Sequence, residues 1–565
     1  MNRVGAAATV DAATLAGLLQ VRDGLVAERP VAGGTVAVAT DLTGACLPEP
    51  GVHRFAMADG PLRSYRRTVT VAAAGAGAWA VRQDVEFEVG VPWFSWVFVL
   101  PVRLSLGRLR PAGHLPRWAP PERLDRRAAV VLGTLCALAV VVGYLDNVLT
   151  QTMTYVGAEY HVGTTGQGIA FGVVQLGAVL ALAALVVADR RGRRQVVLAC
   201  AGGGVALTVL GALTPSLEWL TAAQVLAAAA VGAFYLLLFV VAAEEMPAGS
   251  RAWAAGVLAL CYGLGSGAVL VALPLAGLGP GGWRWVYILA LAAIPIIATC
   301  ASTLPESRRF GIDRRPRPPA WGRCDRPPRG AGRLLPRRLL PRRLSPLHRR
   351  RLLVVGTAMM AYAVFATPAS QFSNEFLRTE RHFSPGGISI LQQLAGTIGG
   401  LGVLVGGRLA DTRGRRPVAA VGVGAGTAVM VASFFAHSWA LWVWAIAGSL
   451  LSYGVVPALA VYGPELFPTR TRGTATGVIT ALGALGGVIG LVGTGLLSSA
   501  IGTIGPALAV AAVGPVIMVV LIVVAFPETA GRQLEELNAD DVSGAGGAGA
   551  NGAGGAGAVA PTRPG

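Results

Sequence analysis

Long apolar stretches that carry no charged side chain are the feature that most constrains what this chain can fold into. They recur at about 20 residues, the length that an α-helix needs to cross the hydrocarbon core of a bilayer. Of all residues, 53% are hydrophobic and only 13% are charged, whereas about 25% of the residues of a soluble domain are charged. This pattern excludes a soluble multidomain enzyme and predicts an integral membrane protein.

Twelve apolar segments can be counted, and an Arg-rich loop at 305–351 separates the first six from the last six. The charge-free blocks 417–464 and 473–527 are each long enough for two helices and a turn. The expected fold is therefore all-α, with twelve transmembrane helices in two six-helix halves at 128–304 and 352–537. The segments are 128–150, 167–188, 195–214, 219–243, 252–275 and 284–304, then 352–374, 388–407, 417–436, 439–463, 473–498 and 505–526.

Arginine is distributed unevenly between the loops, and all 47 basic side chains are Arg. The loops after even-numbered segments hold 27 of them, whereas the loops after odd-numbered segments hold three. Since cytoplasmic loops are enriched in basic residues, we expect both termini in the cytoplasm and a multi-pass protein in the plasma membrane of a bacterium. The 16 Arg between 308 and 351 supply most of the net charge of +18. We therefore expect this loop to contact anionic lipid headgroups, and we expect no nucleic-acid partner.

Short motifs occur once in each half at a nearly constant offset. The sequence ADRRGRR at 188–194 recurs as ADTRGRR at 410–416, an offset of 222. Such repetition predicts two homologous halves with the same topology. Two further pairs are a Pro, Arg and Gly at equal spacing in 247–256 and 468–477, offset by 221, and Pro305-Glu306 with Pro527-Glu528, offset by 222.

Residues 1–110 precede the apolar segments and differ from them. Alternating apolar and polar residues at 67–74 and 78–89, separated by a Gly/Ala turn, predict an antiparallel hairpin. We expect a small cytoplasmic α+β domain, similar to helix-grip lipid-binding domains. The alternative is an interfacial segment, formed by the aromatic, Arg-flanked stretch after the hairpin, with a poorly structured tail. A Pro-rich linker at 111–127 follows, and the Gly/Ala-rich tail at 538–565 is expected to be disordered.

The six Cys and six His show no spacing typical of a disulfide framework or a metal site. A Walker A sequence is also absent. We therefore expect no bound metal, no cofactor, no catalytic residue and no drive by ATP from this chain.

The loop at 407–416, GRLADTRGRR, resembles the signature G-x-L-A-D-x-x-G-R-R of the major facilitator superfamily. The copy in the first half departs from it, with Leu185 and Val187 at the positions of Gly and Leu. Three more stretches, at 305–309, 464–473 and 527–537, are similar to the sugar-porter and metabolite-proton-symporter signatures of that superfamily.

The resemblance covers about 128–537 and implies a secondary active transporter, not an enzyme, that works by alternating access. It implies a monomer that moves a small polar solute, such as a sugar or organic metabolite, together with protons. The first alternative is a drug/proton efflux antiporter, although the element G-P-x-x-G-G of such antiporters is absent from 261–267. A less favoured alternative is a transporter-like membrane sensor.

The acidic and basic residues of the repeated loops are expected to control which side of the transporter is open. An acid at such a junction can cap the next helix, and the neighbouring Arg side chains can form charged pairs with the opposite half. Plain topogenic charge is the alternative, and two copies at one offset weigh against it. The expected conformational residues are Asp189, Arg190, Gly192, Arg193, Glu245, Arg251, Gly407, Asp411, Arg413, Gly414, Arg415, Glu465 and Arg472.

Asp146 is the one carboxylate that falls clearly inside a predicted helix. An ionisable group there costs several kcal/mol unless it faces a wet cavity or a partner, so Asp146 is the candidate for proton coupling. The alternative is an Asp near the outer end of the helix. Four other acids, Glu159, Glu218, Glu375 and Glu380, are expected in solvent at outer helix ends or loops.

Amide side chains inside the predicted helices are candidates for substrate binding, because an amide offers both donors and acceptors. Structural hydrogen bonds between helices are the alternative for each of them. In many family members helix 4 carries an Arg where Gln224 stands here, so the proton-coupling role of that Arg is not carried over. The candidates are Asn147, Gln151, Gln175, Gln224, Gln371, Gln392 and Gln393.

Overall fold

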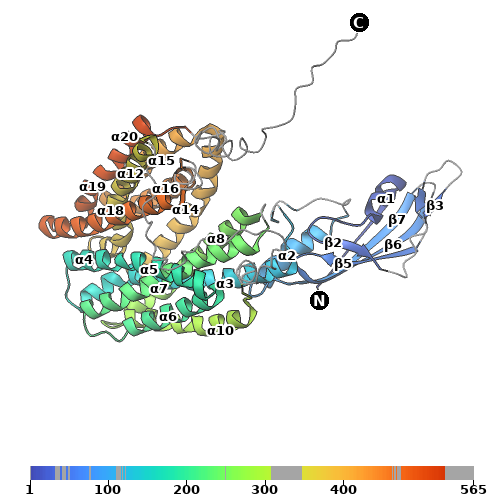
Figure 1. Cartoon of the computed structure of the whole chain (residues 1–565), viewed down its shortest axis with the longest axis horizontal. Helices are drawn as coiled ribbons and strands as arrows, with labels where there is room; N and C mark the ends of the chain where they lie inside the picture. The colour runs from blue at the N-terminus through green and yellow to red at the C-terminus, as the bar shows by residue number, and fades with distance from the viewer. Residues whose placement is uncertain are drawn as a thin grey trace, which may run out of the picture.

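The computed structural model shows a helical body that is preceded in the chain by a smaller β-sheet region (Figure 1). The predicted tail, most of the Arg-rich loop and much of the Pro-rich linker lie outside the described residues. The structure describes residues 2–31, 38–40, 46–48, 51–75, 78–109, 116, 119–120, 122–247, 250–306, 346–460, 462, 466–467 and 472–528, in some helices as backbone alone.

Ten helical segments among the described residues are long and apolar enough to cross a membrane. Helix α14 (Pro385–Arg413) and the pair α4 (Thr164–Val174) and α5 (Leu176–Arg191) cover the two remaining apolar segments of the sequence. A short helix, α13 (Ser373–Thr379), follows helix α12 (Pro346–Gln371). The ten segments are α3 (Arg126–Glu159), α6 (Arg193–Gly211), α7 (Leu217–Glu245), α8 (Arg251–Ala272) with η2 (Leu273–Gly277), the series α9 (Trp283–Ile288), η3 (Leu289–Ala292) and α10 (Ala293–Thr303), α12 (Pro346–Gln371), α15 (Arg415–Phe435), α16 (Ser438–Ala460), α18 (Arg472–Ile501), and α19 (Ile504–Ala511) with α20 (Val513–Ala525).

The sheet region contains the hairpin that the sequence predicts, as strands β6 (Leu62–Gly75) and β7 (Ala78–Val89). They form the centre of a five-stranded antiparallel sheet with the order β1-β7-β6-β5-β2. Helices α1 (Ala12–Leu19) and α2 (Ser95–Leu106) cover one face of this sheet, because their buried Leu and Val side chains join its apolar clusters. The other strands are β1 (Asn2–Asp11), β2 (Ala27–Pro30) and β5 (Gly51–Asp59), and β3 (Val38–Thr40) pairs separately with β4 (Cys46–Pro48).

A buried polar network fills part of the covered face of the sheet. The guanidinium of Arg67 forms an ion pair with Glu28 at 2.6 Å, and both side chains are fully buried. Arg67 also donates to the carbonyl oxygens of Leu18 and Gln20, and the hydroxyl of Tyr65 donates to Glu28 at 2.5 Å. Burial and the Glu28 carboxylate raise the pKa of Tyr65 above its ordinary value. Each nitrogen of this buried guanidinium donates at least one hydrogen bond, and these bonds tie α1 and β2 to the sheet.

The sheet region is attached to the helical body just before α3. The backbone N–H of Glu122 donates to Oγ of Ser250 at 3.0 Å, and that Oγ donates back to the carbonyl oxygen of Glu122 at 2.8 Å. Arg123 forms ion pairs with Asp23 and, at 3.7 Å, with Asp59 of the sheet region. The chain between the two parts is therefore fixed to the turn before α8.

Glycines permit close approach between α3 and α8. A Cβ on Gly143 would lie 2.0 Å from the carbonyl oxygen of Tyr262, and a Cβ on Gly265 would lie 2.0 Å from that of Val140. Each helix thus admits the backbone of the other, as small residues do in tightly packed membrane helices. The same kind of contact occurs between α12 and α18 of the second half.

We predict that Gly265→Ala lowers the free energy of unfolding by about 1–3 kcal/mol, because the added methyl group forces α3 and α8 apart. The matched control on the same helix is Gly256→Ala, since nothing lies within 4 Å of a Cβ there. Thermal unfolding of the detergent-solubilised protein checks the prediction. Equal unfolding midpoints for the two variants would contradict it.

Candidate functional site

Asp146 lies inside α3 and faces the interior of the helical body. The helix has 34 residues and continues for about 20 Å beyond Asp146 at 1.5 Å per residue, so this carboxylate is not at the helix end. The apolar window of α3 is 83% buried, more than that of any other candidate span, yet the Asp146 side chain is exposed. Its hydrogen-bonding partner lies on another helix of the body, so the carboxylate is directed toward α8.

Tyr262 of α8 holds the Asp146 carboxylate. Its hydroxyl donates a hydrogen bond to Oδ2 of Asp146 at 2.6 Å, and it accepts one from Nδ2 of Asn147 at 3.2 Å. The ring of Tyr235 on α7 packs against that of Tyr262, with centroids 5.1 Å apart. Among the described residues no basic side chain forms an ion pair with Asp146. The partner of this carboxyl group is therefore a neutral phenol.

A cluster of amide side chains lies further along α3 from Asp146, and both halves contribute to it. Oγ1 of Thr150 donates to Oε1 of Gln371 on α12 at 2.7 Å. Nδ2 of Asn374 on α13 donates to Oε1 of Gln151 at 2.7 Å, and Oδ1 of Asn374 accepts from Nε2 of Gln392 on α14 at 3.2 Å. Three of the predicted amides therefore meet at one place, where they bond to other side chains of the protein.

The other predicted amides lie elsewhere. Gln175 separates α4 from α5, and its side chain is half-buried. Gln224 is buried on α7, and its Nε2 lies 2.9 Å from where a Cβ on Gly211 would be, so it packs against α6 inside the first half. The side chain of Gln393 extends to α8, where its Oε1 lies 2.9 Å from the position that a Cβ on Gly267 would take. Gln393 therefore contacts the opposite half.

Apolar packing joins the two halves at one end of the body. One buried cluster takes members from both halves, among them Val148 and Val156 of α3, Phe372 and Leu491. The cluster around Leu135 takes members from the first half alone, and a third takes them from the second half alone. The halves are therefore packed together where α3 and α12 finish, and each packs within itself where those helices begin.

Two of the acids expected in solvent form part of this closed end instead. Glu159 accepts a hydrogen bond from the indole of Trp283 and forms an ion pair with Arg284 at 2.5 Å. Glu380 accepts a hydrogen bond from the backbone N–H of Ile504, the first residue of α19. The expectation of solvation is wrong for both, because each carboxylate holds the start of a later helix of its own half.

The remaining two of those acids differ from one another. Glu218 is exposed, as expected, and accepts a hydrogen bond from Ser216. Glu375 on α13 is half-buried beside Thr154 and Gln167 of the first half, which corrects the expectation of a solvated side chain.

A turn with the same backbone geometry occurs in both repeated loops. Gly192 separates α5 from α6 with a φ of 107°, and Gly414 separates α14 from α15 with a φ of 102°. Residues with a side chain rarely adopt such angles, which explains why glycine stands at both positions.

Each of these turns is held by a carboxylate from a distant part of the same half. Glu306 accepts hydrogen bonds from the first two backbone N–H groups of α6 at 3.0 and 3.3 Å. Glu528 accepts them from the first two N–H groups of α15 at 2.9 and 3.1 Å. A helix N-terminus favours such negative charge. Glu306 and Glu528 are related by the offset of 222 residues between the repeated motifs, so these motifs make equivalent contacts in the two halves.

Two of the predicted conformational residues of the first half, Arg193 and Glu245, form ion pairs. Nη1 of Arg193 lies 2.5 Å from Oε1 of Glu244, and buried Glu245 lies 3.1 Å from Nε of Arg127. Arg251 donates to the carbonyl oxygen of Met246 at 3.4 Å. In the second half, Arg415 begins α15 beside Glu528, and Arg413 is exposed. The described part of the chain does not include Glu465. Only the backbone is described at Asp189, Arg190, Gly407, Asp411 and Arg472.

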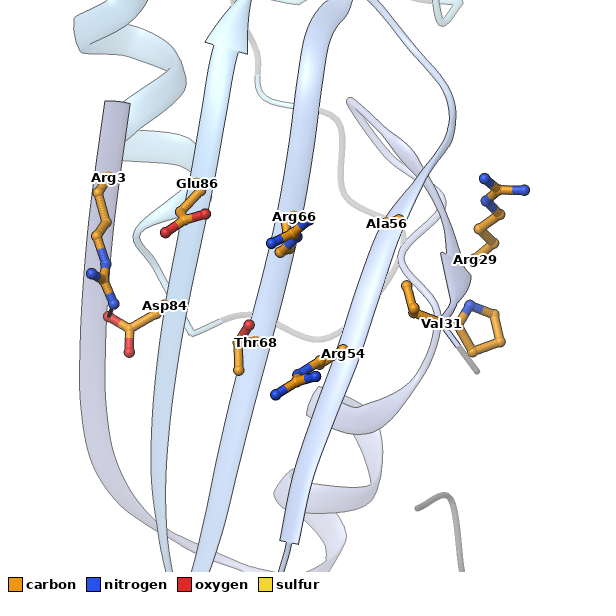
Figure 2. Close-up of a pocket in the computed structure, with 10 residues that line it drawn as sticks. Arg3, Arg29, Val31, Arg54, Ala56, Arg66, Thr68, Asp84 and Glu86 are labelled. Atoms are coloured by element: carbon orange, nitrogen blue, oxygen red, sulfur yellow. Dashed lines mark ion pairs between the residues drawn. The ribbon is translucent and has the colours of Figure 1, made fainter. Parts of the chain in front are cut away.

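A separate hollow of about 820 Å³ lies on the uncovered face of the N-terminal sheet (Figure 2). Arg54, Arg66 and Arg29 stand around the small side chain of Ala56, and Asp84 lies on the neighbouring strand. Guanidinium groups bind carboxylates and phosphates, but this open face is not part of the helical body that carries Asp146. Within the described residues no group of three or more His, Cys, Asp or Glu side chains could hold a metal ion.

The model of the Major Facilitator Superfamily matches residues 135–376 and 353–551. The chain belongs to this superfamily. It is 25% identical over 438 residues to the glucose transporter GlcP of Staphylococcus epidermidis, a match that covers 72% of this chain and 95% of that one. It is 28% identical over 185 residues to the metabolite transport protein YdjK of Escherichia coli, described as putative, covering 32% of this chain and 36% of YdjK.

Solved structures share the fold. The xylose transporter XylE from E. coli, in an inward open conformation, aligns with a TM-score of 0.57 at 14% identity over 73% of this chain and 99% of XylE. The nucleoside transporter NupG aligns with a TM-score of 0.55 at 13% identity over 70% of this chain and 98% of NupG. A bacterial homologue of the human lysosomal transporter Spinster aligns with a TM-score of 0.54 at 18% identity over 71% of this chain and 95% of that chain. The family and this shared fold make the protein a multi-pass membrane transporter and not an enzyme.

We predict that Asn374→Ala opens the end of the body at which the halves meet. Loss of its hydrogen bond to Gln151 removes about 1 kcal/mol of stabilisation from the closed arrangement, which changes the ratio of closed to open molecules about fivefold. Spin labels at Leu213→Cys and Trp439→Cys, both exposed side chains of opposite halves, report the separation by electron paramagnetic resonance.

The matched control is Thr397→Ala on α14, whose hydroxyl donates to Gln393 within its own helix. It should leave the distance distribution unchanged. An Asn374→Ala distribution identical to that of Thr397→Ala would show that the amide cluster does not hold the halves together.

Proposed function

We propose that the protein is a proton-coupled symporter for a small polar solute of the sugar class. In this proposal twelve transmembrane helices form two six-helix halves, and the solute is held between them while access alternates from one side to the other. The observation that carries the proposal is the position of Asp146, an exposed carboxylate on the most enclosed helix. An ionisable group inside a membrane is costly unless it faces water or a partner, and such groups therefore mark functional sites.

The amide cluster supports a solute with many hydroxyl groups. Gln151, Gln371 and Gln392 come from both halves, and amides can donate to and accept from hydroxyls. A solute that takes over these hydrogen bonds would loosen one contact between the halves while it forms its own. Similarity to the glucose transporter GlcP favours a sugar over an amphipathic drug.

Proton coupling requires a group that can change its protonation state where the solute also binds. Asp146 fits this role because its partner is the neutral hydroxyl of Tyr262, and no fixed cation among the described residues holds it ionised. One helical turn separates Asp146 from Thr150, which bonds to Gln371 of the other half. The charge on Asp146 therefore lies close to a contact between the halves.

The proposed location is the cytoplasmic membrane of a bacterium, with both termini in the cytoplasm. The bias of Arg toward alternate loops supports this orientation. Accordingly, the end at which the halves meet faces outward, and the Arg-rich loop at 305–351 lies against anionic headgroups. Both proposed halves belong to one chain, so a monomer is sufficient for transport.

We predict that Asp146→Asn abolishes accumulation of solute that is driven by a proton gradient, because the amide cannot carry a proton through the cycle. Exchange of solute across the membrane without a gradient should persist. Uptake of radiolabelled glucose, xylose and nucleosides into proteoliposomes, with internal pH recorded at the same time, checks both expectations.

The control is Glu218→Gln, which removes an exposed acid at the outer end of α7 and should leave accumulation unchanged. Gradient-driven accumulation by Asp146→Asn at the wild-type level would refute the role of Asp146. Proton-driven movement of a lipophilic cation, with no movement of sugar, would favour a drug antiporter instead.

A further inference from the structure

Helix α2 of the sheet region has two apolar faces. Val102 and Leu106 are buried against the sheet. Trp96, Leu100 and Leu104 are 75%, 62% and 56% exposed. Residues spaced by four lie on the same face of a helix, so these three form one continuous apolar stripe opposite the sheet.

The segment just before α2 is in contact with a membrane-spanning helix. A Cβ on Gly133 of α3 would lie 2.8 Å from Cγ1 of Val91 and 2.8 Å from Cδ of Pro92. Phe94, at the start of α2, packs against the apolar cluster that surrounds α3. Gly133 is about 10 Å along α3 from its first residue at 1.5 Å per residue. The chain therefore touches α3 within its apolar span before it turns back to the sheet.

This contact places the start of α2 beside the apolar span of α3. In Figure 1, α2 lies between the start of α3 and the sheet. Large exposed apolar patches outside a membrane span mark interaction sites. Trp is enriched at the interface between lipid and water, and Arg103 and Arg108 are exposed on and just after the same helix, where they can contact headgroups.

We propose that α2 lies in the interface of the leaflet at which α3 begins, with Trp96, Leu100 and Leu104 among the lipid acyl chains. Interfacial helices bind membranes through such a combination of apolar side chains and flanking positive charge. The sheet packs on the opposite face of α2, so the sheet region is held against the membrane surface. In the orientation proposed above, this is the inner leaflet.

A fluorescent label in vesicles tests this placement. The full-length protein, with its native Cys replaced by Ala and Leu100→Cys labelled with an environment-sensitive nitrobenzoxadiazole dye, is reconstituted into phosphatidylcholine and phosphatidylglycerol vesicles. We expect emission at shorter wavelength, and loss of most of the fluorescence when the phosphatidylcholine carries a doxyl quencher near the headgroup end of its acyl chain. The control is Thr9→Cys on β1, an exposed site of the sheet region, whose label should behave as in water.

Emission from Leu100→Cys equal to that from Thr9→Cys would overturn the proposal. So would emission at shorter wavelength without quenching by the doxyl lipid, because a protein surface such as a second copy would then cover the stripe. If the Cys-free chain does not fold, quenching of intrinsic fluorescence by brominated phosphatidylcholine is compared between the native chain and Trp96→Phe. The proposal then requires that a smaller fraction of the intrinsic fluorescence is quenched in Trp96→Phe than in the native chain.

Discussion

Hydrocarbon offers no hydrogen bonds, and this constraint governs how polar groups are distributed in the helical body. Backbone groups are satisfied within helices, and polar side chains are directed between them. Asp146, Tyr262 and the amides that join α3 to α12 and α13 all lie at interfaces inside the protein. The enclosure of α3 makes this possible, since a helix surrounded by other helices can carry a carboxylate that a lipid-facing helix could not.

Internal repetition has a physical counterpart in the turns between helices. Gly192 and Gly414 give the same backbone geometry, and Glu306 and Glu528 hold the helices that follow. In both halves a carboxylate from the far end of the half binds a helix N-terminus in its middle. This contact ties the end of each half to its middle, as the proposed movement of one half against the other requires.

Much of this arrangement could be predicted from sequence because membrane spans and repeats depend on local composition and on spacing. The family, the apolar segments and the hairpin at 67–89 depend on such patterns. The partners of Asp146 could not be predicted, because Tyr262 is distant in sequence and its contact depends on how α8 crosses α3. Glu159 and Glu380 were expected in solvent, although a signal for an equivalent role existed, since each is followed by a His two residues later at an offset of 221. Both of these His residues have positive φ angles, 55° at His161 and 54° at His382.

The reciprocal hydrogen bonds between Glu122 and Ser250 have a mechanical consequence for alternating access. They fix the sheet region to the first half, at the base of α3 and at the turn before α8. In the alternating access proposed above, the sheet region would move together with the first half whenever that half tilts against the second. The proposed movement of the helices would thus be transmitted along the membrane surface to a folded region outside the membrane spans.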